Sequence, residues 1–118
     1  MNDNSVKIKS FHFAVRIVKL YKHLCDNKRE FVLSKQLLRS GTSIGANVRE
    51  SQNAESSADF IHKFATAQKE TDETLYWLEL LKETDFIVEN EFQSMHADGV
   101  ELLKIIRSII ITSKKKNC

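Results

Sequence analysis

One apolar seam near the end of the sequence constrains the fold more than any other feature. Its members recur at steps of three and four, which places them on one stripe of a helix. They are Phe92, Met95, Gly99, Leu102, Ile106 and Ile109. A sustained seam of this spacing is typical of a helix that packs lengthwise against other helices. The chain of 118 residues has no proline and only three glycines, so long helices are expected throughout it.

Three earlier segments carry comparable seams, so the sequence predicts an all-α fold, an antiparallel up-down-up-down four-helix bundle. The expected helices cover residues 5–25, 33–53, 57–84 and 90–113. A chain of this length suits one domain, residues 1–118, with a modest core. The short polar connection at 26–30 suits antiparallel neighbours.

Hydroxyl side chains mark the starts of two of these helices. Ser56, with Asp59 three residues later, predicts a capping box ahead of helix 57–84. Ser34 is a candidate N-cap for the second helix. Residues 40–43 resemble a turn, but the apolar stripe keeps its phase through them. We therefore expect one continuous second helix, with or without a kink.

All three glycines fall inside predicted helices, where each costs about 1 kcal/mol relative to alanine. Gly41 and Gly45 are predicted to permit close approach of another helix. Gly99 is predicted to face a bulky side chain such as Trp77 or a phenylalanine. Trp77, the only tryptophan, is predicted to anchor a contact between helices or between subunits rather than to stack on a base.

The first helix is more apolar than a monomeric bundle requires. Beside its seam runs a second apolar stripe made of Phe11, Val15, Val18 and Cys25. A bundle helix needs an apolar face of only about 100° or somewhat more. The surplus predicts burial against another subunit, with Phe11, Val15 and Val18 as core or intersubunit anchors.

Charge is divided unevenly along the chain. Residues 1–54 carry ten Lys and Arg against four acids, whereas residues 55–118 carry eight against twelve. On the first helix the cations share one polar stripe, called here the basic stripe, which consists of Lys9, His12, Arg16, Lys19 and His23. No acid occurs between Asn4 and Cys25, so nothing within this helix neutralises the stripe.

Two interpretations of the basic stripe remain open. Aligned cations displace counterions from a nucleic acid backbone without reading its sequence, so the stripe is a candidate site for RNA or DNA. Alternatively, it is a solvated face that meets the acids of helix 57–84, in the same or a neighbouring subunit. Glu70 and Glu73 are expected to pair with Arg39 or Arg49. Lys114 to Lys116 suit the C-terminus of the last helix, where cations complement the helix dipole, and a frayed tail in contact with nucleic acid is the less favoured alternative.

The segment 33–81 also resembles a known family, through the sequence motifs LLRSGTSIGANVRESQNAES, ADFIHK and ETLYWLELL. It is similar to the four-helix bundle proteins encoded in intervening sequences of bacterial 23S ribosomal RNA genes. It also resembles the basic accessory variability protein of diversity-generating retroelements. The resemblance implies a ring-shaped homopentamer and, for the accessory protein, association with nucleic acid and a reverse transcriptase. It implies no catalytic residues.

Two enzymatic arrangements match the sequence only in part. Helical ribonucleases use an Arg and a His on one helix, and Arg16 and His23 lie one heptad apart, although Ile17 is a core position. A di-iron bundle needs two E-x-x-H helices, and only Asp59 with His62 comes close. The two cysteines, Cys25 and Cys118, form no metal-ligand spacing. We therefore expect no metal, no cofactor and no catalysis.

The sequence favours a cytoplasmic, non-enzymatic, homo-oligomeric scaffold associated with nucleic acid. No apolar run is long enough to cross a bilayer, and the first residues lack a signal-peptide core. The alternative function is a protein interaction module whose basic face docks an acidic partner protein. A helical ribonuclease is the third hypothesis.

Overall fold

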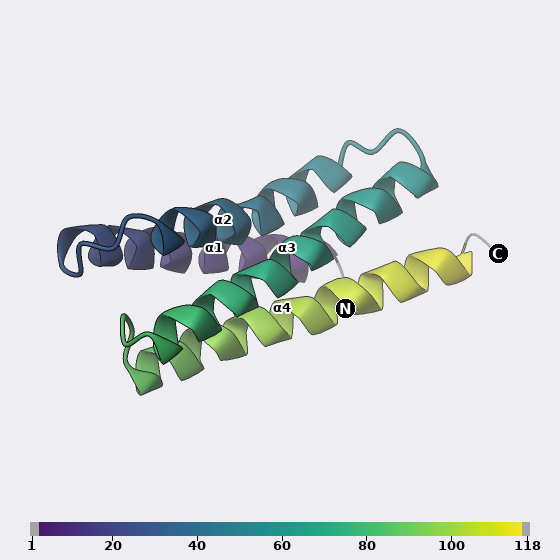
Figure 1. Ribbon diagram of the computed structural model, residues 1–118. Coiled ribbons are helices and arrows are strands. Elements are labelled where there is room, and N and C mark those ends of the chain that lie inside the picture. The colour runs from purple at the N-terminus through teal and green to yellow at the C-terminus, as the bar shows by residue number, and fades with distance from the viewer. Residues whose placement is uncertain (1–2, 117–118) are drawn as a thin grey trace.

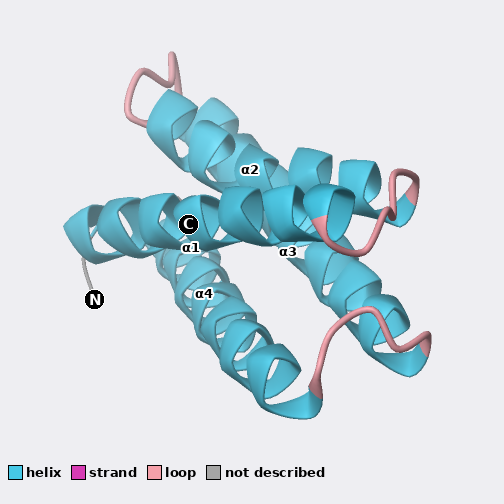
Figure 2. Ribbon diagram, turned by 90° about the vertical axis from the view of Figure 1, so that its left-hand side faces the viewer, coloured by secondary structure: helices cyan, strands magenta, loops and turns pink. Residues whose placement is uncertain are grey.

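The structure, a computed structural model, describes residues 3–116 as four helices joined by short loops (Figure 1). The helices are α1 (Asp3–Asp26), α2 (Leu33–Ser51), α3 (Ser57–Glu83) and α4 (Glu89–Lys116). The described residues form helices and loops only, as Figure 2 shows. The last helix continues three residues past the predicted end, and the second ends two residues before it.

The helices run alternately up and down in an elongated body of 49 × 22 × 19 Å. The α1–α2 and α3–α4 loops lie at one end, and the α2–α3 loop and the C-terminal end of α4 lie at the other (Figure 1). Helix α2 packs along both α1 and α3, and α3 also packs along α4, whereas α1 and α4 touch over a shorter stretch. This arrangement confirms the predicted all-α up-down bundle.

The core lies along the bundle axis, and two glycines of α2 mark where α1 packs closely against it. Gly41 lies against Ile17, so that a Cβ atom at this position would stand 2.7 Å from Ile17 Cγ1. Gly45 lies over Ser10, and a Cβ atom there would stand 3.3 Å from the Ser10 carbonyl oxygen. Both glycines therefore lie where α1 comes near the α2 backbone.

Gly99 faces bulky side chains of two other helices. A Cβ atom there would meet Leu75 Cδ2 at 2.6 Å and Phe13 Cζ at 3.5 Å. The expectation of a phenylalanine is met by Phe13, but Trp77 is not among the nearest atoms. The closest contact is the far end of a flexible leucine.

The prediction that Ser34 caps α2 is wrong, because Glu30 does so. The helix begins at Leu33, and the Glu30 carboxylate accepts hydrogen bonds from the backbone N–H groups of Val32, Leu33 and Ser34 at 3.2, 2.8 and 2.7 Å. The Ser34 hydroxyl donates back to the Glu30 carbonyl at 2.8 Å. Burial alone would raise the pKa of Glu30, but these backbone hydrogen bonds outweigh it and hold the pKa below its usual value. From Leu33 the helix runs unbroken through Gly41, as predicted.

The capping box at the start of α3 is present in a modified form. Ser56 Oγ accepts from the Asp59 N–H at 3.0 Å, as predicted. The Asp59 carboxylate accepts from the N–H of Glu55 at 3.2 Å rather than from that of Ser56. Two backbone donors at the turn are satisfied by side chains.

An ionic network joins α2 to α3 and confirms the expected partners of Arg39. The Arg39 guanidinium donates to Glu70 Oε2 at 2.8 Å and to Glu73. Glu73 also accepts from the Trp77 indole N–H at 3.0 Å. The hydrogen bond from Trp77, together with the Arg39 guanidinium, lowers the pKa of Glu73 despite its burial. Trp77 is therefore bound to a carboxylate of its own helix.

Asp85 ends α3 in the left-handed conformation, with φ of 67°. The N–H of Phe86 donates to the Leu81 carbonyl at 2.9 Å and that of Asp85 to the Lys82 carbonyl at 3.1 Å, the hydrogen bonds of a Schellman motif. Glycine adopts this conformation without the steric cost that a Cβ atom adds.

Asp85→Gly is therefore expected to stabilise the protein by about 0.5 kcal/mol, since relief of the left-handed strain exceeds the extra chain entropy of glycine. Urea denaturation followed by circular dichroism measures the change. Asp85→Ala, which keeps the Cβ atom, should give no gain. Equal stability of the glycine and alanine variants would contradict the argument.

Candidate nucleic-acid interface

Two cations of the basic stripe are neutralised by α4. Lys9 Nζ lies 3.1 Å from Glu101 Oε1, and Arg16 Nη1 lies 2.6 Å from Asp98 Oδ2. Arg16 also donates to the Ser94 hydroxyl at 2.9 Å. The expected acids on helix 57–84 are therefore not the partners of these two cations within the chain. The stripe forms the α1–α4 seam along part of its length.

The other members of the stripe differ in their surroundings. His12 and Lys19 are exposed, and His23 Nδ1 is hydrogen-bonded to Asn27 at 2.7 Å. Arg16, Lys19 and His23 line a shallow depression of about 190 Å³ together with Leu20, Glu91 and Met95. The structure thus brings three of the five residues together, with a carboxylate among them.

The predicted anchors of α1 are not core residues of a single chain. Phe11 is 58% exposed and Val15 is 38% exposed, while Val18 and Trp77 are half-buried. Ile8, also 58% exposed, lies three residues before Phe11 on the same side of the helix. The outer face of α1 is therefore apolar and uncovered within one chain.

The C-terminal half of α4 holds cations that the sequence reasoning did not select. Residues 102–116 include five Lys and Arg and no Asp or Glu. Lys104, Arg107, Lys115 and Lys116 are exposed. Within residues 3–116 none of these four has an ion-pair partner. The acid-free run in the sequence could have revealed these cations. It was hidden because residues 55–118 as a whole carry more acids than Lys and Arg.

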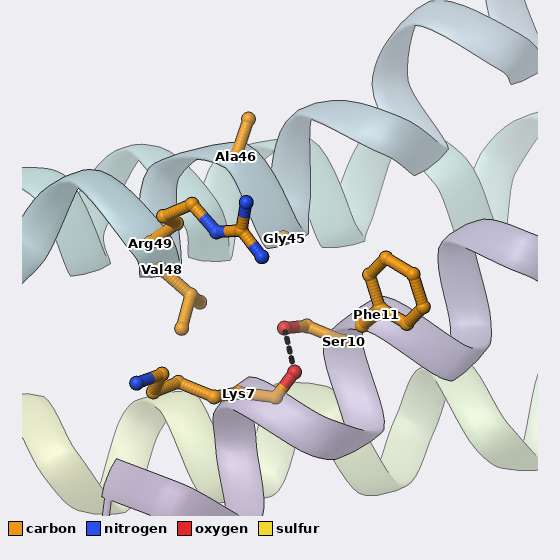
Figure 3. A pocket seen from close by; sticks show the side chains of 7 residues that line it. All are labelled: Lys7, Ser10, Phe11, Gly45, Ala46, Val48 and Arg49. Carbon is orange, nitrogen blue, oxygen red and sulfur yellow. Dashed lines mark hydrogen bonds between the residues drawn. The ribbon is translucent and has the colours of Figure 1, made fainter.

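A groove between α1 and α2 adds two more exposed cations near this end of the bundle. The groove measures about 280 Å³ and is lined by Lys7, Ser10, Phe11, Gly45, Ala46, Val48 and Arg49 (Figure 3). Among the described side chains, neither Lys7 nor Arg49 has a carboxylate within ion-pair distance.

These cations lie in the same half of the bundle because neighbouring helices run antiparallel. The start of α1 lies beside the end of α2 at the groove, and Ser113 and Lys116 of α4 share a depression with Ser51 and Ser56. We call Lys7, Arg49, Lys104, Arg107, Lys115 and Lys116 the basic end.

Comparison with known proteins agrees with this fold. The family profile described as "23S rRNA-intervening sequence protein" matches residues 2–108, which is most of the chain. The chain belongs to the 23S rRNA-intervening sequence protein family. The resemblance carried by residues 33–81 is therefore confirmed and extends well beyond that segment.

A solved structure is similar to this member of the 23S rRNA-intervening sequence protein family over nearly its whole length. It is a crystal structure of a protein of unknown function from the S23 ribosomal protein family of Bacteroides thetaiotaomicron. The two chains share 56% identity and a TM-score of 0.92, and the match covers 93% of this chain and 98% of the other. No curated protein matches the chain significantly.

The described residues contain neither a metal-binding cluster nor a membrane-spanning helix. Within residues 3–116 no three His, Cys, Asp or Glu side chains are grouped so that they could hold a metal ion. None of the described helices is long and apolar enough to span a membrane. The described surface therefore offers charged and apolar side chains for contacts, and its exposed carboxylates include those of Glu50, Glu83 and Glu91.

Proposed function

We propose that this protein is a non-enzymatic, self-associating scaffold that binds nucleic acid through its basic end. The observation that carries the proposal is the contrast between two sets of cations. Lys9 and Arg16 are held by carboxylates of α4, whereas the six cations of the basic end have no such partner in the described part of the chain. Cations without an internal partner are the ones available to phosphates.

The proposal revises the residues first selected from the sequence. Phosphate contacts supply sequence-independent affinity, and each one releases counterions from the nucleic acid. A cation already paired with a carboxylate must first give up that partner. We therefore assign the main phosphate contacts to the basic end, and supporting contacts to Lys19 and His12 of the basic stripe.

Self-association is supported by the uncovered apolar face of α1. Ile8 and Val15 are large apolar side chains that protrude from a helix already packed on α2 and α4. Such faces mark interaction surfaces when they are contiguous. In a closed ring each subunit would present its basic end in an equivalent position, so several weak phosphate contacts would act together.

Binding should weaken with salt, and the slope should depend on the basic end. Labelled duplex DNA and structured RNA are titrated over a salt series with the wild type and with Lys104→Gln/Arg107→Gln. Each phosphate contact contributes about 0.9 to the slope of log affinity against log salt, so the double variant should lower the slope by about 2.

The matched control is Lys28→Gln/Lys35→Gln, which removes the same charge from two exposed cations at the opposite end. Its slope should equal that of the wild type. A slope that changes equally in both double variants would show that only net charge matters. Absence of binding at low salt would reject the nucleic-acid function and leave the protein interaction module.

A ribonuclease is the second candidate, because Arg16 and His23 border one depression with Lys19 and Glu91. A histidine beside cations can transfer protons while the cations hold a phosphate. Against it, Arg16 is engaged by Asp98 and Ser94. Gel analysis of the same RNA samples decides: cleavage products that disappear with His23→Ala would favour the enzyme.

A further inference from the structure

The groove between α1 and α2 combines an apolar floor with cations at its rim. Val48 is 1% exposed and forms part of the floor, while Gly45 and Ala46 leave the α2 backbone uncovered by large side chains. Figure 3 shows the Arg49 guanidinium reaching over the groove, with Lys7 on the α1 side. The volume of about 280 Å³ lies just below the range of pockets that hold drug-sized molecules. It therefore suits one small ring system.

Phe11 gives this groove an aromatic wall. Its ring stands at one end of the groove in Figure 3 and is 58% exposed. Phenylalanine is normally buried, and an exposed ring beside unpaired cations is the combination by which proteins hold single-stranded nucleic acid. The ring stacks on a base while cations on either side follow the backbone phosphates.

We propose that the α1–α2 groove binds an unpaired nucleobase of single-stranded nucleic acid, with Phe11 stacking on the base and Lys7 and Arg49 contacting the adjacent phosphates. The inference rests on the proposed function and adds to it a preference for single strands. Bases in a duplex are stacked on each other and cannot enter the groove, whereas its outer phosphates can still reach Lys104 and Arg107.

The neighbouring chemistry is consistent with a stacked base. Ser10 is 1% exposed, and its hydroxyl donates to the Lys7 carbonyl at 3.3 Å, so it supports the turn that carries Lys7. The groove walls offer few polar atoms that could read a base edge. Recognition is therefore expected to tolerate every base, since each has a π face.

The test compares a labelled oligouridine with a duplex of equal length, using wild type, Phe11→Ala, Phe11→Tyr and Phe31→Ala. Phe11→Ala should bind the single strand about tenfold more weakly and the duplex as well as the wild type does. Phe11→Tyr keeps the ring and should bind normally. Phe31→Ala is the matched control, a truncation of another exposed phenylalanine, which lies in the α1–α2 loop outside the groove, and it should have no effect.

A second variant tests the cations without removing them. Ala46→Glu places a carboxylate at the α2 rim of the groove, three residues before Arg49 and at an exposed helical position. It should weaken oligouridine binding and leave duplex binding nearly unchanged. An oligonucleotide with 2-aminopurine as its fluorescent base reports stacking directly, because its emission should be quenched by the wild type and not by Phe11→Ala.

Three outcomes would overturn the inference. Wild-type affinity of Phe11→Ala for oligouridine would show that the ring does not stack. Dissociation of the assembly by Phe11→Ala, seen in sedimentation, would make Phe11 a contact between subunits instead. If the wild type binds neither probe, the inference falls together with the proposed function, whereas duplex binding without single-strand preference rejects the inference alone.

Discussion

Gly41→Val is expected to destabilise the bundle by about 3 kcal/mol, the upper part of the range for overpacked cores. A Cβ atom at Gly41 would lie 2.7 and 2.8 Å from Ile17 Cγ1 and Cγ2. Ile17 is fully buried, and its β-branched side chain has little rotamer freedom. The two helices must therefore move apart. Thermal unfolding should show a midpoint about 10 °C lower than that of the wild type.

The matched comparison uses alanine at two glycines. Gly41→Ala should still destabilise, because about 1 kcal/mol of helix propensity does not offset the clash with Ile17. Gly99→Ala should be neutral or stabilising, since its contact, Leu75 Cδ2, is the end of a flexible side chain. Equal effects of the two alanine variants would show that helix propensity, not packing, decides at these positions. In an Ile17→Ala background the cost of Gly41→Ala should disappear.

Glu30→Ala is expected to cost about 2 kcal/mol at neutral pH, through loss of a cap and of charge-assisted hydrogen bonds. The carboxylate serves three backbone N–H groups at the start of α2, and the residue is only 8% exposed. Without it these donors at a partly buried helix end would lose their protein partner. Urea denaturation of both proteins at pH 7 measures the difference.

The contribution of Glu30 should also depend on pH. Because its pKa in the folded protein lies below the ordinary 4.5, folding favours the charged form. The stabilisation is complete above pH 4.5 and is lost as the pH falls through the lower folded pKa. The difference in free energy of unfolding between wild type and Glu30→Ala should therefore become smaller in acid. A gap that is constant from pH 7 to below the folded pKa would contradict a cap by the charged carboxylate.

Apolar periodicity was sufficient to predict the bundle. The seam through Phe92 and Ile109 and the phase kept across Gly41 depend only on residue spacing, which survives whatever the helices pack against. The cap of α2 was missed because Glu30 lies two residues before the capping position, Val32, and its carboxylate reaches forward to the first backbone N–H groups of the helix. Arg29, just before it, turns the chain with a φ of 55°. Spacing rules for caps do not cover such a reversal.

The candidate interface was only partly predictable, because pairing across helices is a tertiary property. Lys9 and Arg16 form a regular stripe in the sequence, yet their availability depends on which face of α4 lies opposite. The cations of α4 were obscured because the charge count over residues 55–118 combined the acidic helix α3 with the cation-rich end of α4. The groove at Phe11 required two helices to be placed side by side.

The seam between α1 and α4 has a consequence for the energetics of ligand capture. Glu101 and Asp98 are counterions tethered beside Lys9 and Arg16 by the fold itself. These two carboxylates compete within the molecule with any anionic ligand of Lys9 and Arg16. A polyanion must displace Glu101 or Asp98 before it can contact Lys9 or Arg16, whereas His12 and Lys19 of the same stripe stay accessible.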